Sequence, residues 1–389
     1  MTKIRVMVVD DSVVVRRLVS DVLAGDPEIE VVATASNGKV ALQRLEQTPC
    51  DLLTLDVEMP ELDGIGTVIE VRKKYPKLPI IMFSTLTSRA AEATIDALSR
   101  GANDYVTKPD GVANVAAARE KIKGELVPKI KALTGVRTTG KLPLLRSSAS
   151  PAPRPTTSAL PVHRTGVITL PTPNRPITGV ISVSPPRSSI VSAIAIGVST
   201  GGPPALQTLI GALPASLPVP VFIVQHMPPT FTTMLADRLT RSSAVPVLEA
   251  AAGMKVESGK VYLAPGDYHL VVDRGPMGTF LRTNQDPPEC SCRPSVDVLF
   301  RSVAAAYGAN VLALVLTGMG SDGTRGAEYI RAAGGTVLAQ DQATSVVWGM
   351  PGSVARAGLA ASVLPIGDMA GEIVQRTHAQ THKPAIGQG

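Results

Sequence analysis

The sequence predicts two α/β domains, each a parallel β-sheet covered by helices on both faces, joined by a long irregular linker. Short apolar runs of strand length alternate with amphipathic stretches of helix length in both halves of the chain. Aromatic residues make up only 3 % of the 389 residues, whereas 44 % are hydrophobic, which is typical of closely packed α/β layers. The segment between the halves is rich in proline and has neither helical nor strand periodicity.

The first region, residues 1–125, contains five strand-like apolar runs. The stretch Val13–Leu23 has helical spacing and ends before Gly25, a residue suited to closing a helix. In an open parallel sheet of order 2-1-3-4-5, the topological switch lies between strands 1 and 3, and ligands bind at their carboxyl ends. The five predicted strands are Ile4–Val9, Glu30–Ala33, Leu52–Leu55, Ile80–Phe83 and Tyr105–Val106.

Polar residues follow four of these strands. Asp10 and Asp11 close the first strand and Asp56 closes the third, and converging carboxylates repel one another unless a cation joins them. Mg²⁺, which prefers oxygen ligands and retains exchangeable waters, suits such a site. Ser84 and Lys108 close strands 4 and 5, where a hydroxyl and an ammonium group can contact phosphoryl oxygens. Each residue alone is typical of a helix cap or a solvated charge, but together they predict a phosphate site.

The basic excess of the chain lies in the predicted linker, residues 136–189. Residues 136–190 contain seven Lys and Arg, ten Pro and no Asp or Glu. Those seven charges exceed the net charge of +6 of the whole chain, so the excess is typical of a solvated tether and does not indicate a nucleic-acid site. Residues 379–389 are expected to form a flexible tail.

Composition also limits where the protein acts. No apolar run approaches the ~20 residues needed to span a bilayer, and the first ten residues lack the apolar stretch of a signal peptide. Three cysteines are too few, and of the wrong parity, for a disulfide framework. We therefore expect a cytoplasmic protein that is not embedded in a membrane.

The second region, residues 190–378, is expected to form a Rossmann-like, doubly wound sheet with a serine after its first strand. The run Ile194–Ile196 leads into Gly197-Val198-Ser199-Thr200-Gly201, which has the G-x-S-x-G pattern of a nucleophile elbow. The glycines allow a tight turn and leave space for a substrate carbonyl. Taken alone, the pattern also fits a structural Gly-Ser turn or a phosphate-binding helix N-terminus.

Two further polar residues follow apolar strands of this region. His226 follows the run Val221–Val224, and Asp322 follows the run Val311–Leu316. If the strands are parallel, both residues share one rim of the sheet with Ser199. His226 can then take the proton of Ser199, while Asp322 fixes the imidazole tautomer and stabilises the imidazolium.

Other interpretations of these residues remain open at this stage. A single histidine at a strand end is more often structural than catalytic, and Asp322 between glycines also fits a turn. Backbone amides in the Gly-rich loops, those of Met319 or Thr200, are the candidate oxyanion donors. The segment Cys290–Cys292 has no second ligand pair at zinc-site spacing, which indicates a loop.

Residues 1–125 resemble a two-component receiver domain with a flavodoxin-like fold. The matching elements are Asp10-Asp11, Asp56 in Leu55-Asp56-Val57-Glu58-Met59-Pro60, Ser84, and Tyr105 with Lys108-Pro109. The resemblance implies that Asp56 accepts a phosphoryl group from a chemotaxis histidine kinase. It further implies that Asp10, Asp11, Asp56 and the Val57 carbonyl hold Mg²⁺, and that Ser84 and Lys108 contact the phosphate.

Residues 190–377 resemble the catalytic domain of chemotaxis protein-glutamate methylesterases of the CheB type, and the order receiver, linker, esterase matches as well. The matching segments are Gly197–Gly202, Gln225–Pro228, Val261–Gly266, Arg293–Phe300, Leu316–Gly323, and Ala339-Gln340-Asp341 with Trp348-Gly349-Met350-Pro351. The chain order Ser, His, Asp differs from the Ser, Asp, His order of α/β-hydrolases. Cys292 stands where a histidine is expected, Gly352 where a basic residue is common, and the linker is longer than a minimal tether.

This second resemblance implies a triad of Ser199, His226 and Asp322, supported by Thr200 and the Met319 amide and needing no cofactor. The implied substrates are glutamyl methyl esters and certain glutamines on methyl-accepting chemoreceptors. The alternative is a response regulator whose output domain is a non-catalytic protein-binding module. A DNA-binding output is disfavoured because the second region has no basic recognition helix.

Overall fold

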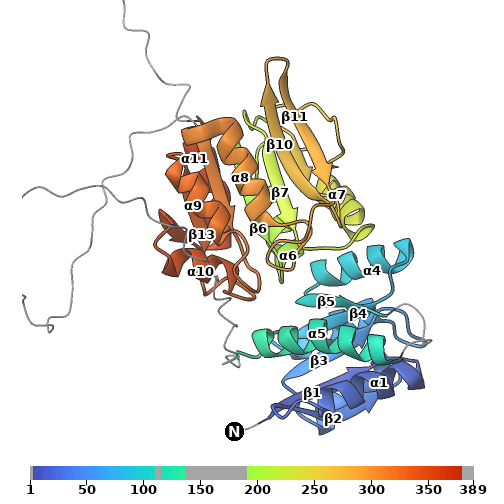
Figure 1. Cartoon of the computed structure of the whole chain (residues 1–389). Coiled ribbons are helices and arrows are strands. Elements are labelled where there is room, and N and C mark those ends of the chain that lie inside the picture. The colour runs from blue at the N-terminus through green and yellow to red at the C-terminus, as the bar shows by residue number, and fades with distance from the viewer. Residues whose placement is uncertain (1–2, 110–114, 136–190, 379–389) are drawn as a thin grey trace, which may run out of the picture. The chain divides into compact units, whose positions relative to one another are not determined.

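The computed structural model describes residues 3–109, 115–135 and 191–378 (Figure 1). The predicted linker, residues 136–189, and the predicted tail, residues 379–389, lie outside the described residues. The described residues before and after the linker belong to one compact unit. Within the described ranges, no helix has the length and apolar character needed to cross a membrane.

The first sheet has the order β2-β1-β3-β4-β5 with every pair parallel, which confirms the predicted topology. Its strands and helices alternate along the chain, and Gly25 is the C-cap of the first helix. The elements are β1 (Ile4–Val9), α1 (Val13–Ala24), β2 (Ile29–Ala35), α2 (Gly38–Gln47), β3 (Leu52–Asp56), α3 (Gly64–Lys74), β4 (Ile80–Ser84), α4 (Ser88–Ser99), β5 (Asp104–Thr107) and α5 (Val115–Leu133).

Alternation along the strands sends apolar side chains to both faces of this sheet. On one face Val6, Val8 and Ile81 pack with residues of α1 and α5, and on the other Met7 and Leu53 pack towards α2, α3 and α4. Helix α5 runs past the expected boundary at residue 125, because three of its later residues are buried in the first of these cores. They are Leu126, Val127 and Ile130.

The second sheet has the order β14-β13-β12-β6-β7-β9-β8 with all strands parallel. Because the chain runs outward from β6 in one direction and later continues from β12 in the other, the topological switch lies between β6 and β12. Its strands are β6 (Ala193–Val198), β7 (Val221–Gln225), β8 (Val247–Glu249), β9 (Val261–Leu263), β12 (Val311–Val315), β13 (Thr336–Gln340) and β14 (Ser362–Leu364).

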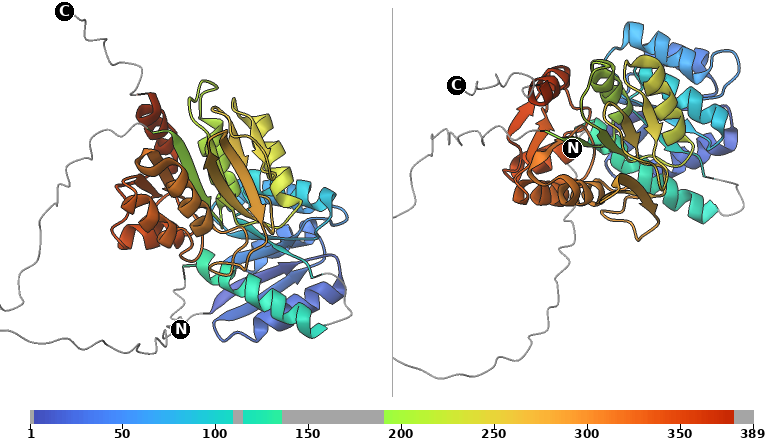
Figure 2. Two further views of the ribbon diagram at one scale, coloured as in Figure 1. Left: turned by 45° about the horizontal axis from the view of Figure 1, so that its top comes forward. Right: turned by 90° about the horizontal axis from the view of Figure 1, so that it is seen from above.

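Helices cover both faces of this sheet (Figure 2). An antiparallel hairpin, β10 with β11, packs against one of these helices, α8. Residues of α6, α7 and α11 bury one face, and residues of α8, α9 and α10 bury the other. This arrangement is the doubly wound architecture predicted from the sequence. The remaining elements are α6 (Gly202–Gly211), α7 (Phe231–Ser242), β10 (His269–Gly275), β11 (Gly278–Asn284), α8 (Val296–Tyr307), η1 (Gly308–Asn310), α9 (Thr324–Ala332), α10 (Met350–Arg356) and α11 (Ile366–His378).

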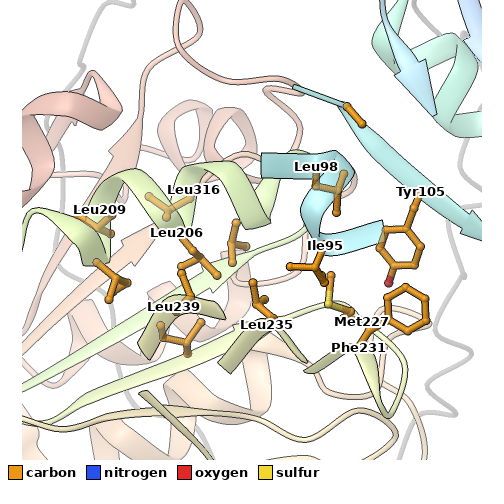
Figure 3. Packing of buried hydrophobic residues seen from close by; sticks show 14 of the residues in the cluster. Ile95, Leu98, Tyr105, Leu206, Leu209, Met227, Phe231, Leu235, Leu239 and Leu316 are labelled. Carbon is orange, nitrogen blue, oxygen red and sulfur yellow. The ribbon is translucent and has the colours of Figure 1, made fainter. Parts of the chain in front are cut away.

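Apolar side chains of the two domains share one buried cluster (Figure 3). The ring of Tyr105 on β5 stacks on that of Phe231 at the start of α7, with centroids 4.8 Å apart and an interplanar angle of 11°. Ile95 of α4 belongs to the same cluster. Beside it, Arg238 Nη1 of α7 lies 2.9 Å from Asp96 Oδ1 of α4. Burial of the two aromatic rings contributes more to the stability of this contact than the ion pair does, because partly exposed ion pairs stabilise by only about 0–1 kcal/mol.

Candidate active site

The acidic residues of the first domain meet at the carboxyl ends of β1 and β3, as predicted. Asp10 and Asp56 are buried, Asp11 is exposed, and carboxylate oxygens of all three lie within 4.8 Å of one another. Lys108, after β5, joins them: its Nζ lies 2.9 Å from Asp10 Oδ2 and 2.7 Å from Asp56 Oδ2. The ammonium group therefore offsets part of the repulsion between the two buried carboxylates.

Burial dominates the electrostatics of this acidic site. It raises the pKa of Asp56 to about 6, helped by the nearby charge of Asp10 and opposed by Lys108. The pKa of Asp10 is also raised, again chiefly by burial. Both carboxylates are therefore more costly to ionise than exposed ones, and additional positive charge at the site would stabilise them.

Ser84 lies at the end of β4, but its hydroxyl is already engaged. Ser84 Oγ donates to the carbonyls of Thr85 and Ala90 at 3.1 and 3.3 Å, and it accepts from Thr94 Oγ1 at 2.8 Å. The carbonyl of Val57 accepts a hydrogen bond from the Gly64 amide at 2.9 Å. Within the described part of the chain, no hydrogen bond joins Ser84 to the acidic cluster. Ser84 and the cluster therefore lie at the same edge of the sheet but are not hydrogen-bonded to each other.

In the second domain, glycines in and around the turn after β6 occupy places that have no room for a side chain. A Cβ at Gly197 would lie 2.3 Å from Val296, and one at Gly318 would lie 2.8 Å from Ser199 Cβ. Gly201 has φ +75°, a left-handed conformation that favours glycine. Helix α6 then starts with Pro in its first turn. The loop after β12 can thus approach Ser199 closely.

His226 and Asp322 are joined directly. His226 Nε2 lies 2.8 Å from Asp322 Oδ2, although the two residues come from loops after different strands, β7 and β12. An ionised carboxylate only accepts hydrogen bonds, so Nε2 carries the hydrogen and Nδ1 is the nitrogen left for other chemistry. The structure therefore brings these two residues together, while their catalytic roles stay predictions.

The carboxylate of Asp322 is held by groups other than His226 as well. Burial alone raises the pKa of Asp322, but hydrogen bonds from His226 and from backbone amides lower it below its usual value. The carboxylate therefore stays ionised and fixed in orientation. Its other donors are Ser295 Oγ and the amides of Val296, Asp297 and Gly323, at 2.7–2.9 Å.

The pKa of His226 is raised to about 9. Burial lowers it, but the hydrogen bonds with Asp322 and Cys292 and their charges outweigh burial. Desolvation therefore lowers the pKa of this imidazole and its partners raise it, and the effect of the partners is the larger one.

Ser199 shares a cavity of about 770 Å³ with His226, Met319 and Cys292. No hydrogen bond joins Ser199 Oγ to His226 among the described residues; such bonds are often long before substrate binds. In the same described ranges, the amides of Thr200 and Met319 donate no hydrogen bond. Both amides are thus available as donors in the loops that flank Ser199.

Two residues that the sequence analysis noted without giving them a role, Gln225 and Cys292, also shape the site. Gln225 Nε2 donates to the carbonyls of Ser199 and His226, at 3.0 and 3.2 Å, and so ties the two loops together. Cys292 Sγ lies 3.5 Å from His226 Nδ1. Its position directly before Arg293, which begins one of the segments noted in the sequence, was the available signal.

Comparisons with known proteins agree with both domains. Residues 194–373 match the CheB methylesterase family, and residues 6–119 match the response regulator receiver domain. A Nocardioides relative named protein-glutamate methylesterase/protein-glutamine glutaminase is 50 % identical over 98 % of this chain and 97 % of its own length. A relative of the same name from Trichodesmium erythraeum is 46 % identical over 97 % of this chain and 99 % of its own.

Among solved structures, the Thermotoga maritima CheB methylesterase catalytic domain is 42 % identical, covering 48 % of this chain and 98 % of that one, with a TM-score of 0.47. The two family matches and these relatives define a response regulator with a hydrolase output domain. The chain belongs to the CheB methylesterase family.

Proposed function

We propose that this chain is a phosphorylation-regulated protein-glutamate methylesterase and protein-glutamine glutaminase in which Ser199, His226 and Asp322 form the catalytic triad. The proposal extends the names of its relatives to this chain. The observation that carries the triad is the 2.8 Å hydrogen bond between His226 and Asp322 beside the cavity that Ser199 lines. The enzyme class is that of carboxylic ester hydrolases.

The geometry suits acyl transfer. Ser199 Oγ attacks the γ-carbonyl of a glutamyl methyl ester while His226 Nδ1 takes its proton, and Asp322 stabilises the imidazolium through Nε2–H. The amides of Thr200 and Met319, which donate no hydrogen bond among the described residues, would donate to the oxyanion. His226 returns the proton to the departing methoxide, giving methanol, and water then releases glutamate. With a glutamine substrate, ammonia leaves in place of methanol.

The first domain would control this chemistry through Asp56, the proposed phosphoryl acceptor, with a histidine kinase as donor. Its neighbours Asp10 and Asp11 offer only oxygen ligands, and the buried carboxylates would be stabilised by added positive charge, so the donor set fits Mg²⁺. When bound, Mg²⁺ would supply charge neutralisation, with the Val57 carbonyl as a further ligand. Lys108 would contact the phosphoryl oxygens.

Ser84 has a separate role in this proposal. Its hydroxyl would have to leave Thr94 and the carbonyls of Thr85 and Ala90 to reach a phosphoryl group on Asp56. That movement would rearrange the contact between β4 and α4, which connects phosphorylation to the far face of the domain.

We infer that the unphosphorylated receiver restrains the esterase. The cavity beside Ser199 and His226 is also lined by Tyr105, Thr107 and Lys129 of the receiver. Phosphorylation of Asp56 can release this restraint only if the phosphoryl group stabilises the released arrangement of the two domains more than the restrained one. The proposed substrates are cytoplasmic segments of methyl-accepting chemoreceptors; no nucleic-acid partner is proposed.

The decisive experiment measures methanol release from methylated chemoreceptor, with and without acetyl phosphate. We expect release by the full chain, and faster release when acetyl phosphate is present. In parallel, a fluorophosphonate probe should label Ser199 in the native protein but not in Ser199→Ala. Absence of both release and labelling would favour the alternative, a response regulator with a non-catalytic protein-binding output domain.

A further inference from the structure

The proposed catalytic imidazole has a thiol neighbour on the nitrogen that must accept the serine proton. Cys292 Sγ lies 3.5 Å from His226 Nδ1, and both residues line the cavity. Cys292 is partly buried and carries no disulfide. Sequence reasoning assigned this segment to a loop because no second ligand pair was evident along the chain; the second ligand comes instead from the end of β7.

The spacing of these two atoms matches a pair of zinc ligands. A ring nitrogen at about 2.0 Å and a thiolate sulfur at about 2.3 Å from a tetrahedral zinc ion lie about 3.5 Å apart. A carboxylate oxygen of Asp322 lies within 4.8 Å of both donors. Histidine and cysteine together also form a donor set that suits zinc better than Mg²⁺ or Ca²⁺.

The other ring nitrogen of His226 has the partner that zinc-bound histidines have. Its Nε2 donates to Asp322 Oδ2 at 2.8 Å, which leaves the lone pair of the neutral ring on Nδ1, facing Cys292. Such carboxylate–histidine–zinc arrangements fix the ring and raise its basicity. Asp322 already accepts from four other donors, so it acts as the outer partner and not as a ligand.

We propose that His226 Nδ1 and Cys292 Sγ bind a Zn²⁺ ion, with the remaining positions open to water from the cavity, and that zinc reversibly inhibits the enzyme. Binding releases the thiol proton of Cys292 and, where the imidazole is protonated, its Nδ1 proton as well, because the ion then uses the Nδ1 lone pair. That lone pair is the one that takes the proton of Ser199, so a zinc-bound His226 cannot act as the general base. The inhibition rests on the proposed function, whereas the metal site does not.

The neighbouring thiol provides a matched control. Cys290 lies two residues earlier in the same turn, yet its Sγ contacts Asp297 Oδ2 at 3.7 Å and not His226. Cys290 and Ser291 both have positive φ, so this turn is not extended. In an extended strand, side chains two residues apart would point to the same face. The variants Cys292→Ser and Cys290→Ser therefore remove a thiol from the same turn with different expected consequences.

The first measurement uses Co²⁺ as a spectroscopic probe of the full chain. The cysteines are kept reduced with a phosphine that does not bind the metal. We expect a thiolate-to-cobalt absorption band in the near ultraviolet that saturates at one equivalent and disappears when Zn²⁺ is added. Cys292→Ser and His226→Ala should lack the band, and Cys290→Ser should keep it. A band that persists in Cys292→Ser, or no band in the parent protein, would overturn the proposed site.

The second measurement follows methanol release against free Zn²⁺, each variant normalised to its own rate in chelator. We expect inhibition of the parent and of Cys290→Ser that EDTA reverses. In Cys292→Ser the half-inhibiting concentration should rise by about 100-fold or more, since loss of even an outer partner costs about 10- to 100-fold. Equal zinc sensitivity in the parent and Cys292→Ser would contradict the inference. A cobalt band without any esterase activity would instead refute only the proposed function.

Discussion

The two domains place polar residues at equivalent points, the carboxyl ends of parallel strands beside a topological switch, yet they treat buried carboxylates differently. In the receiver, Asp10 and Asp56 share the ammonium group of Lys108. In the esterase, Asp322 is held by His226, a hydroxyl and three backbone amides. Burial correspondingly leaves the pKa of Asp56 raised to about 6, whereas hydrogen bonds leave the pKa of Asp322 lowered.

The difference fits the tasks proposed for the two sites. A carboxylate surrounded by fixed hydrogen-bond donors keeps one orientation and one charge, which suits a residue that positions an imidazole. A carboxylate held by a long lysine side chain can exchange that partner for a cation or a phosphoryl group. The same fold position therefore supports a rigid site in one domain and a switchable site in the other.

The largest expected effect is at the switchable site. Asp56→Asn replaces the proposed acceptor carboxylate with a neutral amide that is not nucleophilic, so we expect no phosphorylation from acetyl phosphate and no stimulation of methanol release. In the parent protein, EDTA should abolish phosphorylation, and Asp11→Asn should weaken it strongly. The matched control is Asp21→Asn, an exposed receiver residue that pairs with Arg119. Undiminished phosphorylation in EDTA would contradict the proposed Mg²⁺ site.

The next effect is at the rigid site. Ser199→Ala and His226→Ala should each lower kcat for ester hydrolysis by about 10³-fold or more, because members of a triad act as a unit. Asp322→Asn should also be severe, since it favours the wrong tautomer of His226. Ser242→Ala, an exposed position at the end of α7, is the control and should hydrolyse at the parent rate. Methanol release by Ser199→Ala near the parent rate would end the serine-esterase proposal.

A pH profile tests the electrostatics of the rigid site. The raised pKa of His226, about 9, means that the protonated imidazole is favoured and the base form is lost as pH falls through 9. In chelator, kcat/KM should therefore fall about tenfold per pH unit below 9, whereas an unperturbed histidine would keep it level down to about pH 6.5. A profile already level between pH 7 and 9 would show that Asp322 and Cys292 do not raise the pKa in solution.

The smallest expected effect concerns the contact between the domains. Arg238→Ala removes the ion pair with Asp96, and because both side chains are partly exposed we expect only about a two- to fivefold rise in the unphosphorylated rate. Arg241→Ala on the same helix is the control, because no ion pair involves it among the described residues. A fragment that starts near residue 189 should show a larger rise. If this fragment is no faster than the unphosphorylated full chain, restraint by the receiver is wrong.

Much of the fold could be predicted from local sequence. The five strands of the receiver follow from apolar runs of strand length, whereas their order came from the resemblance to a flavodoxin-like receiver. Ser199, His226 and Asp322 could be selected because each follows such a run. Parallel strands bring their carboxyl ends to one edge, so residues distant in the chain can be grouped without coordinates. In the structure, a hydrogen bond joins His226 to Asp322, two of the three residues grouped in this way.

Tertiary structure alone decided how side chains pair at those edges. No local pattern indicates that Lys108 contacts both Asp10 and Asp56, that Gln225 joins the loops of Ser199 and His226, or that helix α5 remains in the core past residue 125. The contact of Cys292 with His226 joins residues 66 positions apart. Periodicity reports which face of an element is buried, but the partner of a polar group depends on how loops from separate strands meet, and only the packed structure fixes that.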